Sequence, residues 1–348
     1  MVYRIAIDGM GGDYAPKEII EGVEAARDQH SNLEFLIFGN QKKITKYLKN
    51  SDRITIVPTT QVIAMADEPV KSIRTKKDSS LVRAANAVKD GQADALFSAG
   101  NTGALLASAI FIVGRINGID RPGLLTAMPK IGNKLSQFVM MDVGANAENK
   151  PSHLYQYGLL GSFYAEHVLK IKKPVVRLLN NGSEEDKGDQ VHKVAHQILK
   201  KNKSINFKGN IEARELLYDD TAVVVSDGFS GNAALKATEG TALTMLNVVK
   251  TRVENGSLRT KFAGLLLKPA LRSIRDELDY NNAGGAVILG VNAPVVKAHG
   301  SSKAIAVTNT IFQVEEILES KLVNDVQKFV KAHAKQLQAI KQLDQAEN

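Results

Sequence analysis

The sequence predicts an α/β protein built around a large sheet, and three observations support that fold class. Strand-like and helix-like hydrophobic patterns alternate along the whole chain, as in α/β layers. Seven short apolar runs end in clusters of Gly, Asn, Asp and Ser, and six of these clusters lead into a helical pattern. The chain has 348 residues, 44% hydrophobic and 24% charged, an ordinary globular composition. We therefore expect residues 1–348 to form a single large α/β domain or two lobes that share a sheet.

The predicted strands and helices follow in order along the chain. The strands that precede polar clusters cover 4–7, 95–97, 138–141, 175–179, 223–225, 286–289 and 295–296. Pro16 begins the first predicted helix. Further helices are expected over 186–202, 231–250 and 314–348, the last as one long polar C-terminal helix. Ligands bind beyond the carboxyl ends of strands in an open α/β sheet, so the clusters predict a polar site along one edge.

Residues 257–278 form a basic amphipathic segment. An apolar stripe of Leu, Ile and Phe is interleaved with Arg259, Lys261, Lys268, Arg272 and Arg275. We expect Pro269 to break the segment into two short helices. Such a segment suits either the surface of an anionic membrane or packing within a dimer, and the residues alone leave both open.

The composition excludes several kinds of site and indicates which partners the protein could bind. The chain has no Cys, which excludes disulfides, thiolate metal sites and a Cys nucleophile and fits a reducing cytoplasm. The net charge of +8 favours acidic partners such as nucleic acid, anionic lipid, phosphorylated ligands or an acidic carrier protein, although solubility alone would also account for it. An aromatic content of 5% without Trp argues against single-stranded nucleic acid. We see no signal-peptide pattern and no apolar stretch near the roughly 18 residues of a membrane span.

Three Gly-containing loops are candidate anion sites, because each places backbone N–H groups at a predicted helix start. They are 100–103, 299–302 and 227–232, the last followed by Lys236. Each loop taken alone is equally typical of a tight turn. The stretch 8–13 reads Asp-Gly-Met-Gly-Gly-Asp, which lacks the spacing of a dinucleotide fingerprint, and no P-loop pattern occurs.

Two single residues carry sharper hypotheses. His299 follows a predicted strand and suits general acid/base work or donation to an oxyanion, with a structural loop histidine as the alternative. Lys187 lies at a helix start, where acids are usual, and suits either a cation above an anion site or an exposed charge. His192 and His196 are four residues apart, but they lack the adjacent Glu and third ligand of a zinc site, so we expect no metal.

Eight stretches of the sequence carry a family resemblance: 8–13, 98–104, 114–122, 141–146, 207–212, 227–232, 280–286 and 297–300. Together they resemble bacterial phosphate acyltransferases, the acyl-carrier-protein:phosphate transacylases of phospholipid synthesis. The resemblance runs from Ile5 to about Ala306. Gly9 and Gly158 stand where the family usually has Ala, and neither departure removes a functional group.

The resemblance implies a three-layer α/β/α sandwich like those of isocitrate and isopropylmalate dehydrogenases and phosphotransacetylases. It implies a homodimer without metal or organic cofactor that transfers a fatty acyl group from acyl-carrier protein to inorganic phosphate. The acyl phosphate would supply a membrane glycerol-3-phosphate acyltransferase, and the enzyme would be cytoplasmic and peripherally associated with an anionic membrane surface. The alternatives are an acyl-CoA-dependent phosphotransacetylase, a dehydrogenase of related fold, and a non-catalytic membrane-surface scaffold that binds the carrier.

The motifs and the resemblance together assign the site residues. The expected catalytic residues are Lys187, Asn232 and His299, with Asn232 or His299 as the oxyanion donor. The expected substrate-binding residues are Asp8, Gly11, Gly12, Asn101, Thr102, Gly103, Asp227, Gly228, Lys236, Gly300 and Ser301. Phosphate would sit at the two helix starts near Asn101 and His299, with the two lysines offsetting its charge.

Phosphate is expected to attack the thioester directly, without an acyl-enzyme, so that positioning and electrostatics carry the catalysis. Ser98 or Ser301 as a nucleophile stays open. The candidate docking surface for an acidic carrier is a basic patch formed by Lys71, Arg74, Lys76 and Lys77.

Overall fold

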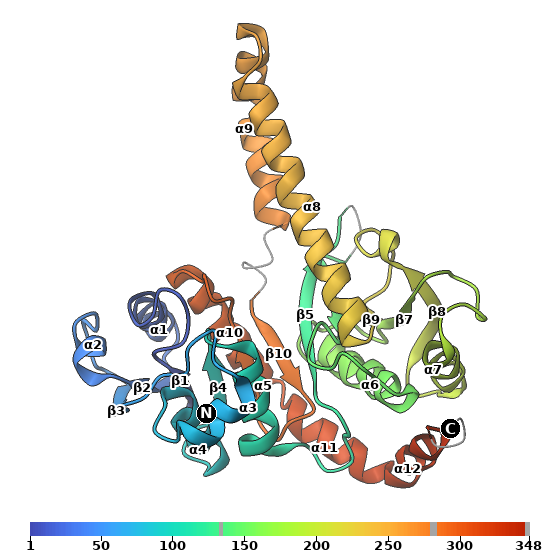
Figure 1. Cartoon of the computed structure of the whole chain (residues 1–348), viewed down its shortest axis with the longest axis horizontal. Coiled ribbons are helices and arrows are strands. Elements are labelled where there is room, and N and C mark those ends of the chain that lie inside the picture. The colour runs from blue at the N-terminus through green and yellow to red at the C-terminus, as the bar shows by residue number, and fades with distance from the viewer. Residues whose placement is uncertain (132–134, 279–283, 345–348) are drawn as a thin grey trace.

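The computed structural model describes residues 1–131, 135–278 and 284–344, and its centre is one long sheet (Figure 1). Within these residues the sheet has 11 strands. Across the sheet they follow the order β3 (Ile54–Pro58), β2 (Leu33–Gly39), β1 (Tyr3–Asp8), β4 (Ala95–Ser98), β11 (Val295–Lys297), β10 (Ala286–Leu289), β5 (Gly123–Pro129), β6 (Gln137–Met141), β9 (Val223–Val225), β7 (Val175–Asn180) and β8 (Asn206–Glu212). All seven predicted strands lie in this sheet.

The sheet has two halves whose strands run in opposite directions. Strands β1, β2, β3, β4 and β11 are parallel to one another, and so are β6, β7, β8 and β9. At the centre, β10 pairs antiparallel with β11 and β5, and β5 pairs antiparallel with β6. The expectation that the polar clusters share one edge is therefore wrong, because these central strands reverse the direction of the second half.

The register of the central strands nevertheless brings the carboxyl ends of both halves to nearly the same level. Lys297, the last residue of β11, pairs with Ala286 of β10. The next residue, Val287, pairs with Leu125 of β5, which pairs with Met141 at the end of β6. The two strand ends thus differ by one residue, or about 3.3 Å along the strands. Polar loops from both halves meet at the middle of the sheet.

Apolar cores on both faces of the sheet confirm the three-layer α/β/α architecture. In β1, Ile5 and Ile7 belong to one core and Ala6 to the other, as the alternation of a strand requires. The first core is covered by α1 (Lys17–Gln29), α6 (Pro151–His167), α7 (Gln190–Lys201) and α10 (Ala304–Glu319). The second is covered by α4 (Ser80–Lys89), α5 (Thr102–Ser108) and the π-helix η1 (Ala109–Gly114). Three short helices are α2 (Gln41–Thr45), α3 (Pro69–Thr75) and η2 (Ala213–Glu215).

The C-terminal segment is made of several helices. The prediction of one helix over 314–348 is wrong, because α10 is followed by α11 (Leu322–Ala332) and α12 (Ala334–Leu343), while 345–348 lie outside the described residues. Lys321 has a φ of 56°, in the left-handed region, and turns the chain between α10 and α11. This turn lets α11 and α12 both contact α6, with Val326 and Leu337 buried.

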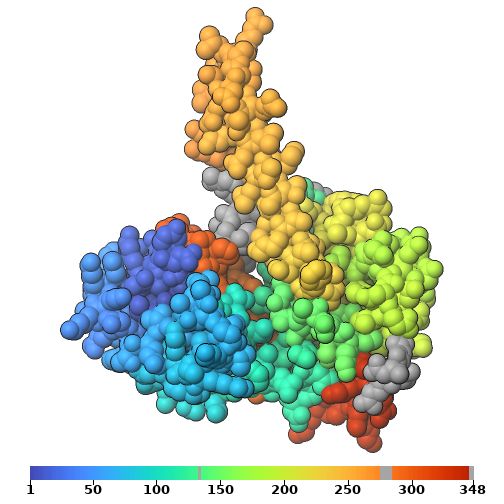
Figure 2. All heavy atoms as spheres, viewed as in Figure 1, coloured from blue at the N-terminus to red at the C-terminus, as the bar shows by residue number. Residues whose placement is uncertain are grey.

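Helices α8 (Gly228–Glu254) and α9 (Leu258–Leu278) pack as a hairpin that projects from the body of the molecule (Figures 1 and 2). The two helices approach closely at Gly264, where a Cβ would collide with Val253. The expected break at Pro269 is wrong, because this residue lies inside a continuous helix. A proline costs a helix one backbone hydrogen bond, and on an exposed helix water can satisfy the freed carbonyl.

Candidate active site

A cavity of about 300 Å³ lies where the carboxyl ends of the two halves meet. Thr102, Lys297 and His299 line it from the first half of the sheet, and Asn232 and Lys236 line it from α8. The structure therefore brings together two expected catalytic residues and two expected binding residues. We call this space the central cavity.

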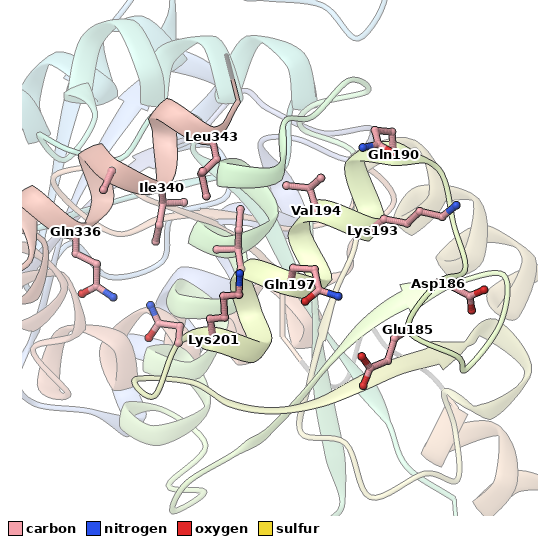
Figure 3. A pocket seen from close by; sticks show the side chains of 13 residues that line it. Glu185, Asp186, Gln190, Lys193, Val194, Gln197, Lys201, Gln336, Ile340 and Leu343 are labelled. Atoms are coloured by element: carbon pink, nitrogen blue, oxygen red, sulfur yellow. The ribbon is translucent and has the colours of Figure 1, made fainter. Parts of the chain in front are cut away.

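A larger cavity of about 960 Å³ lies between α7 and α12 (Figure 3). Val194 on α7 and Ile340 and Leu343 on α12 supply apolar side chains, and Lys193 and Glu185 also line it. Of the residues expected to form the site, none in the described part of the chain lines this cavity. The central cavity is the candidate active site, because it holds the polar groups that follow the strand ends.

A backbone turn fixes the tautomer of His299. Ser301 donates its backbone N–H to His299 Nδ1 at 3.2 Å, and Ser301 Oγ lies 2.7 Å from the same atom. An N–H can only donate, so Nδ1 accepts and the proton of the neutral ring is on Nε2. Burial, followed by the positive charges of Lys297 and Lys236, lowers the pKa of His299. His299 is therefore a neutral donor at neutral pH, the form suited to an oxyanion.

Lys297 is a candidate that the sequence analysis missed. This residue is only 8% exposed and lines the central cavity. Its Nζ donates to the carbonyl oxygens of Ala99, at 3.4 Å, and Ala298. Burial lowers the pKa of Lys297 to about 8, against the opposing effects of Asp8 and Asp13. The available sequence signal was a lysine that follows two valines of a predicted strand and precedes the expected histidine by two positions.

Asp8 is buried at the end of β1. Ser98 Oγ donates to Asp8 Oδ2 at 2.7 Å, whereas the buried Oδ1 has no hydrogen-bond partner in the described structure. Burial raises the pKa of Asp8, and the nearby hydroxyls of Ser80 and Ser98 act in the opposite direction. A Cβ at Gly11 would collide with the Asp8 carboxylate and lie 2.8 Å from the backbone nitrogen of Gly100. Gly11 therefore makes room for the carboxylate.

Gly12 and Gly300 join the first loop of the chain to the last one. Gly12 has a φ of 108°, which an L side chain rarely adopts. A Cβ there would also lie 3.2 Å from Gly300 O. The same carbonyl accepts from the backbone N–H of Asp13 at 2.8 Å. These contacts hold the loop that carries His299 against the end of β1.

The N-terminus of α10 is already occupied by a carboxylate. The expectation that 299–302 begins a helix is wrong, because these residues form a turn and α10 begins at Ala304. The Ala304 N–H donates to Glu18 Oε2 at 2.9 Å, and Lys303 Nζ lies 3.6 Å from Glu18 Oε1. A negative side chain at this helix start disfavours a second anion there.

Asn101 and Gly103 stabilise the loop at the N-terminus of α5, the other helix start at which phosphate was expected. Asn101 Oδ1 accepts from the Ala104 N–H at 2.9 Å and caps α5. Asn101 Nδ2 donates to backbone carbonyls within 64–67. A Cβ at Gly103 would lie 2.5 Å from Pro69 Cγ, so this glycine permits a close approach of α3. The intervening threonine is the residue of this loop that lines the central cavity.

Asp227 fixes the start of α8, the helix that carries Asn232 and Lys236. Its Oδ1 accepts from two backbone N–H groups of the first turn, at 3.0 Å and 2.8 Å. Burial raises the pKa of Asp227, but hydrogen bonds from His192 and Ser230 lower it to about 2. The carboxylate acts as a helix cap, and it helps to position Asn232 and Lys236 about one and two turns further along the helix.

Of the 14 expected site residues, ten lie outside the lining of the central cavity, among them Gly228 and Lys187. Gly228 packs against Asn146, where a Cβ would collide with the backbone. Lys187 is exposed in the loop after β7, and its carbonyl accepts from Asn180 Nδ2 at 3.2 Å. Lys187 therefore does not line the cavity that the two other expected catalytic residues line.

Apolar side chains make up much of the lining of the central cavity, and among its polar groups Lys236, Lys297, His299 and Asn232 are cations or hydrogen-bond donors, while Glu239 is paired with Lys236. These cations and donors suit an anionic ligand and the negative charge that develops when a carbonyl is attacked. Among the described residues, His, Asp and Glu form no group of three or more that could hold a metal ion. None of the helices in the described ranges has the length and apolarity that a membrane span requires.

The three layers, the two-directional sheet and the central cavity place the chain in the α/β fold class of the phosphotransacylases. A phosphotransacetylase from Streptococcus pyogenes has a TM-score of 0.58 at 16% identity, with 91% of this chain and 94% of that chain covered. A branched-chain phosphotransacylase from Enterococcus faecalis V583 has a TM-score of 0.57 at 14% identity, with 91% and 98% covered. At these identities the similarity concerns the fold.

Residues 3–325 match the family described as "Fatty acid synthesis protein", and the chain belongs to that family. A phosphate acyltransferase from Leuconostoc mesenteroides is 63% identical over 338 residues, which cover 97% of this chain and 99% of the relative. Phosphate acyltransferases from Oenococcus oeni and Pediococcus pentosaceus are 60% and 52% identical, covering 97% and 98% of this chain and 98% and 97% of the relatives. These matches confirm the family resemblance.

Proposed function

We propose that this protein transfers a fatty acyl group from acyl-carrier protein to inorganic phosphate and so supplies acyl phosphate to phospholipid synthesis. The observation that carries the proposal is the gathering of Lys236, Lys297 and His299 in one cavity at the carboxyl ends of both half-sheets. Transfer to phosphate also agrees with the name phosphate acyltransferase that the relatives carry. The product, an acyl phosphate, has the chemistry required by a membrane glycerol-3-phosphate acyltransferase.

In the proposed reaction, an oxygen of HPO₄²⁻ forms a bond to the thioester carbonyl carbon. The carbon–sulfur bond breaks, its electron pair leaves on sulfur, and the proton of the phosphate ends on the released thiol. The developing oxyanion accepts from His299 Nε2–H and from the side-chain amide of Asn232. One such donor is worth about 10²–10³-fold in rate.

Direct attack needs no acyl-enzyme. The chain has no Cys, and Ser98 Oγ donates to Asp8, while Ser301 Oγ lies 2.7 Å from His299 Nδ1. Each hydroxyl lies beside a group that could accept its proton, but neither serine lines the central cavity, which favours direct attack. Lys236 Nζ lies 2.8 Å from Glu239, and both side chains line the central cavity.

Lys187 remains a proposed catalytic residue under one structural condition. Its loop must approach the start of α8 when the substrate binds, because the side chain is exposed outside the cavity lining. The following helix α7 is already tied to that point, since His192 Nε2 lies 3.5 Å from Asp227 Oδ2. A Lys187→Ala variant with unchanged turnover would remove this residue from the mechanism.

The acidic carrier is proposed to dock on part of the predicted basic patch. Lys76 donates to the Val62 carbonyl and to Asp67, so its charge is already paired. Lys71, Arg74 and Lys77 are exposed on and after α3. We call these three residues the carrier patch. A positive patch would mainly raise the association rate of an acidic carrier.

Peripheral attachment to an anionic membrane is proposed for the α8–α9 hairpin. Leu258, Phe262, Leu265 and Leu266 are each more than 60% exposed. Exposed apolar side chains next to Arg and Lys are typical of interfacial helices. Packing of the same leucines in a homodimer is the rival proposal, since a large exposed apolar surface also marks protein interfaces.

A second candidate function is acyl transfer from CoA, which the fold shared with phosphotransacetylases favours. The deciding experiment incubates the protein with phosphate and either acyl-carrier-protein or CoA thioesters and measures acyl phosphate by mass spectrometry. Faster turnover with the carrier thioester is expected, and faster turnover with CoA would favour the second candidate. A non-catalytic scaffold would form no acyl phosphate, and Asn232→Ala would leave its binding unchanged.

A further inference from the structure

Lys297 is a buried cation with an unusual position in the sheet. It ends β11, between Ser98 of β4 and Ala286 of β10 in the paired strands. The side chain is 8% exposed and lines the central cavity. Burying an ammonium group is costly unless other groups compensate for its charge. The structure must therefore supply partners or leave a place for an anion.

Among the residues that the structure describes, the partners of Lys297 satisfy its ammonium group only in part. Its Nζ contacts two backbone carbonyls, those of Ala99 and Ala298. An ammonium group has three N–H donors, so two carbonyls leave one donor for a ligand in the cavity. Asp8 and Asp13 add a favourable electrostatic field. The Asp8 carboxylate accepts a hydrogen bond from Ser98 Oγ and forms no ion pair with Lys297 within the described contacts.

Backbone anchoring makes Lys297 different from the other lysine of the cavity. Lys236 extends from α8, is paired with Glu239 at 2.8 Å and has a side chain that is 56% exposed. Lys297 is held by the central strands and cannot leave the cavity without breaking buried contacts. A fixed charge costs little reorganisation when a substrate binds, whereas an exposed lysine must be ordered first.

We infer that Lys297 binds the attacking phosphate, its ammonium group contacting a phosphate oxygen other than the one that bonds to the acyl carbon. This inference rests on the proposed function and names the cation of that site. Phosphate supplies the counter-charge that the protein leaves incomplete. The oxyanion of the acyl group is assigned to His299 and Asn232, so the two negative charges of the reaction have separate partners.

The charge of Lys297 makes phosphate binding dependent on pH. The titratable and charged groups that face it come from β1 and its loop, from the loop after β11 and from α8: Asp8, Asp13, His299, Lys236 and Glu239. The pKa of His299 is lowered from its ordinary value, so this histidine is neutral throughout the alkaline range. Burial lowers the pKa of Lys297 to about 8. Phosphate affinity should therefore fall as pH rises through about 8.

Lys130 is a matched control inside the same chain. It is 3% exposed, donates to the Leu216 carbonyl at 2.9 Å and lies 4.5 Å from the centre of the Phe138 ring. Burial lowers the pKa of Lys130 to about 8 as well. Lys130 does not line the central cavity. Its replacement removes a buried lysine but leaves the proposed phosphate-binding lysine in place.

The test measures phosphate binding to the protein alone by calorimetry, and the KM for phosphate in the acyl transfer assay. Lys297→Met should weaken binding and raise this KM by about 100-fold, with the KM for the acyl donor nearly unchanged. Lys130→Met should leave both phosphate constants at the parental value. An unchanged phosphate KM in folded Lys297→Met, or an equal loss in Lys130→Met, would overturn the inference.

A pH titration of the unmodified protein keeps the inference testable if Lys297→Met fails to fold. The dissociation constant of phosphate should rise about tenfold per pH unit above about 8, and a constant value between pH 7 and 9 would overturn the inference. Lys130→Met should show the parental pH profile. If the parent forms no acyl phosphate, the proposed function fails, while the calorimetric measurements still decide whether Lys297 binds phosphate.

Discussion

Ala304 donates its backbone N–H to the carboxylate of Glu18 at 2.9 Å, so the N-terminus of α10 is neutralised by the protein itself. The two residues are 286 positions apart in the sequence. Their contact moves the proposed phosphate position away from this helix start and toward the buried ammonium of Lys297. A helix dipole that is already compensated offers little to a second anion.

Gly11→Ala should destabilise the protein. The new Cβ would collide with the Asp8 carboxylate and approach the Gly100 nitrogen at 2.8 Å, where backbone has little room to move. Overpacking of this kind typically costs about 1–3 kcal/mol of unfolding free energy. Thermal and urea unfolding measure the change.

The matched control is Gly240→Ala in the middle of α8. No atom lies within 4 Å of a Cβ built there, so this change should add about 0.5–1 kcal/mol through helix propensity. If Gly11→Ala were as stable as the parent, the carboxylate would have to occupy a different position. Because the two substitutions should change the free energy of unfolding in opposite directions, they distinguish crowding at Asp8 from a general effect of replacing glycine.

Local patterns predicted the fold class because apolar runs and turn residues report directly on strands and their ends. The predicted strand at 4–7 lies within β1, and its alternation divides the two cores. The direction of the second half-sheet was not predictable in this way, because strand polarity depends on long-range pairing. The turn at Lys321 was missed for the same reason, because it depends on the long-range packing of α11 and α12 against α6 and interrupts an otherwise helical pattern.

The lining of the candidate site was predictable where residues lie in the first turns of helices that follow strands, as Thr102 and Asn232 do. Asn101 has the same local signal, but its amide is engaged with carbonyls of a loop more than 30 residues away. Lys297 was missed for the opposite reason: a lysine after a strand is usually solvated, and only the tertiary structure buries it. Long-range contacts therefore decide which polar residues are free to act.

His192 should make stability depend on pH. Burial opposes protonation, but hydrogen bonds with Asp227 and Asp189 raise the pKa of His192 above its ordinary value of about 6.5. The folded state therefore holds the proton more tightly than the unfolded state. This contribution is fully present below about pH 6.5 and is lost as pH rises through the higher pKa of the folded state.

Urea titrations of His192→Asn and of the parent at several pH values measure this contribution. The difference in unfolding free energy should be largest below about pH 6.5 and shrink at higher pH. Introducing Asp189→Asn in both proteins should reduce the pH dependence, since it removes the carboxylate 2.8 Å from His192 Nδ1. A difference that does not vary with pH would mean that His192 contributes packing alone.

Charge reversal in the carrier patch, Lys71→Glu with Arg74→Glu, should raise the KM for acyl-carrier protein by about tenfold and leave kcat nearly unchanged. The physical reason is slower association of an acidic carrier, and salt should reduce the effect because these charges are exposed. Stopped-flow association at two ionic strengths, together with steady-state kinetics, provides the measurement. The matched control reverses two exposed charges elsewhere, with Lys331→Glu on α11 and Lys335→Glu on α12. Equal effects of both pairs would assign the change to net charge and reject the patch.

Leu266→Glu with Leu267→Glu should abolish attachment to anionic membranes. The two leucines are 67% and 54% exposed on α9, one of the two helices of the projecting hairpin (Figure 2). Apolar insertion is worth about 25 cal/mol per Å² of buried surface, and the new carboxylates add repulsion from anionic lipid. Co-sedimentation with anionic vesicles measures binding, with Tyr218→Glu as the control because this residue is 60% exposed outside the hairpin. Undiminished binding of the double variant would reject the hairpin as the anchor, and a shift from dimer to monomer on gel filtration would show that these leucines pack between subunits.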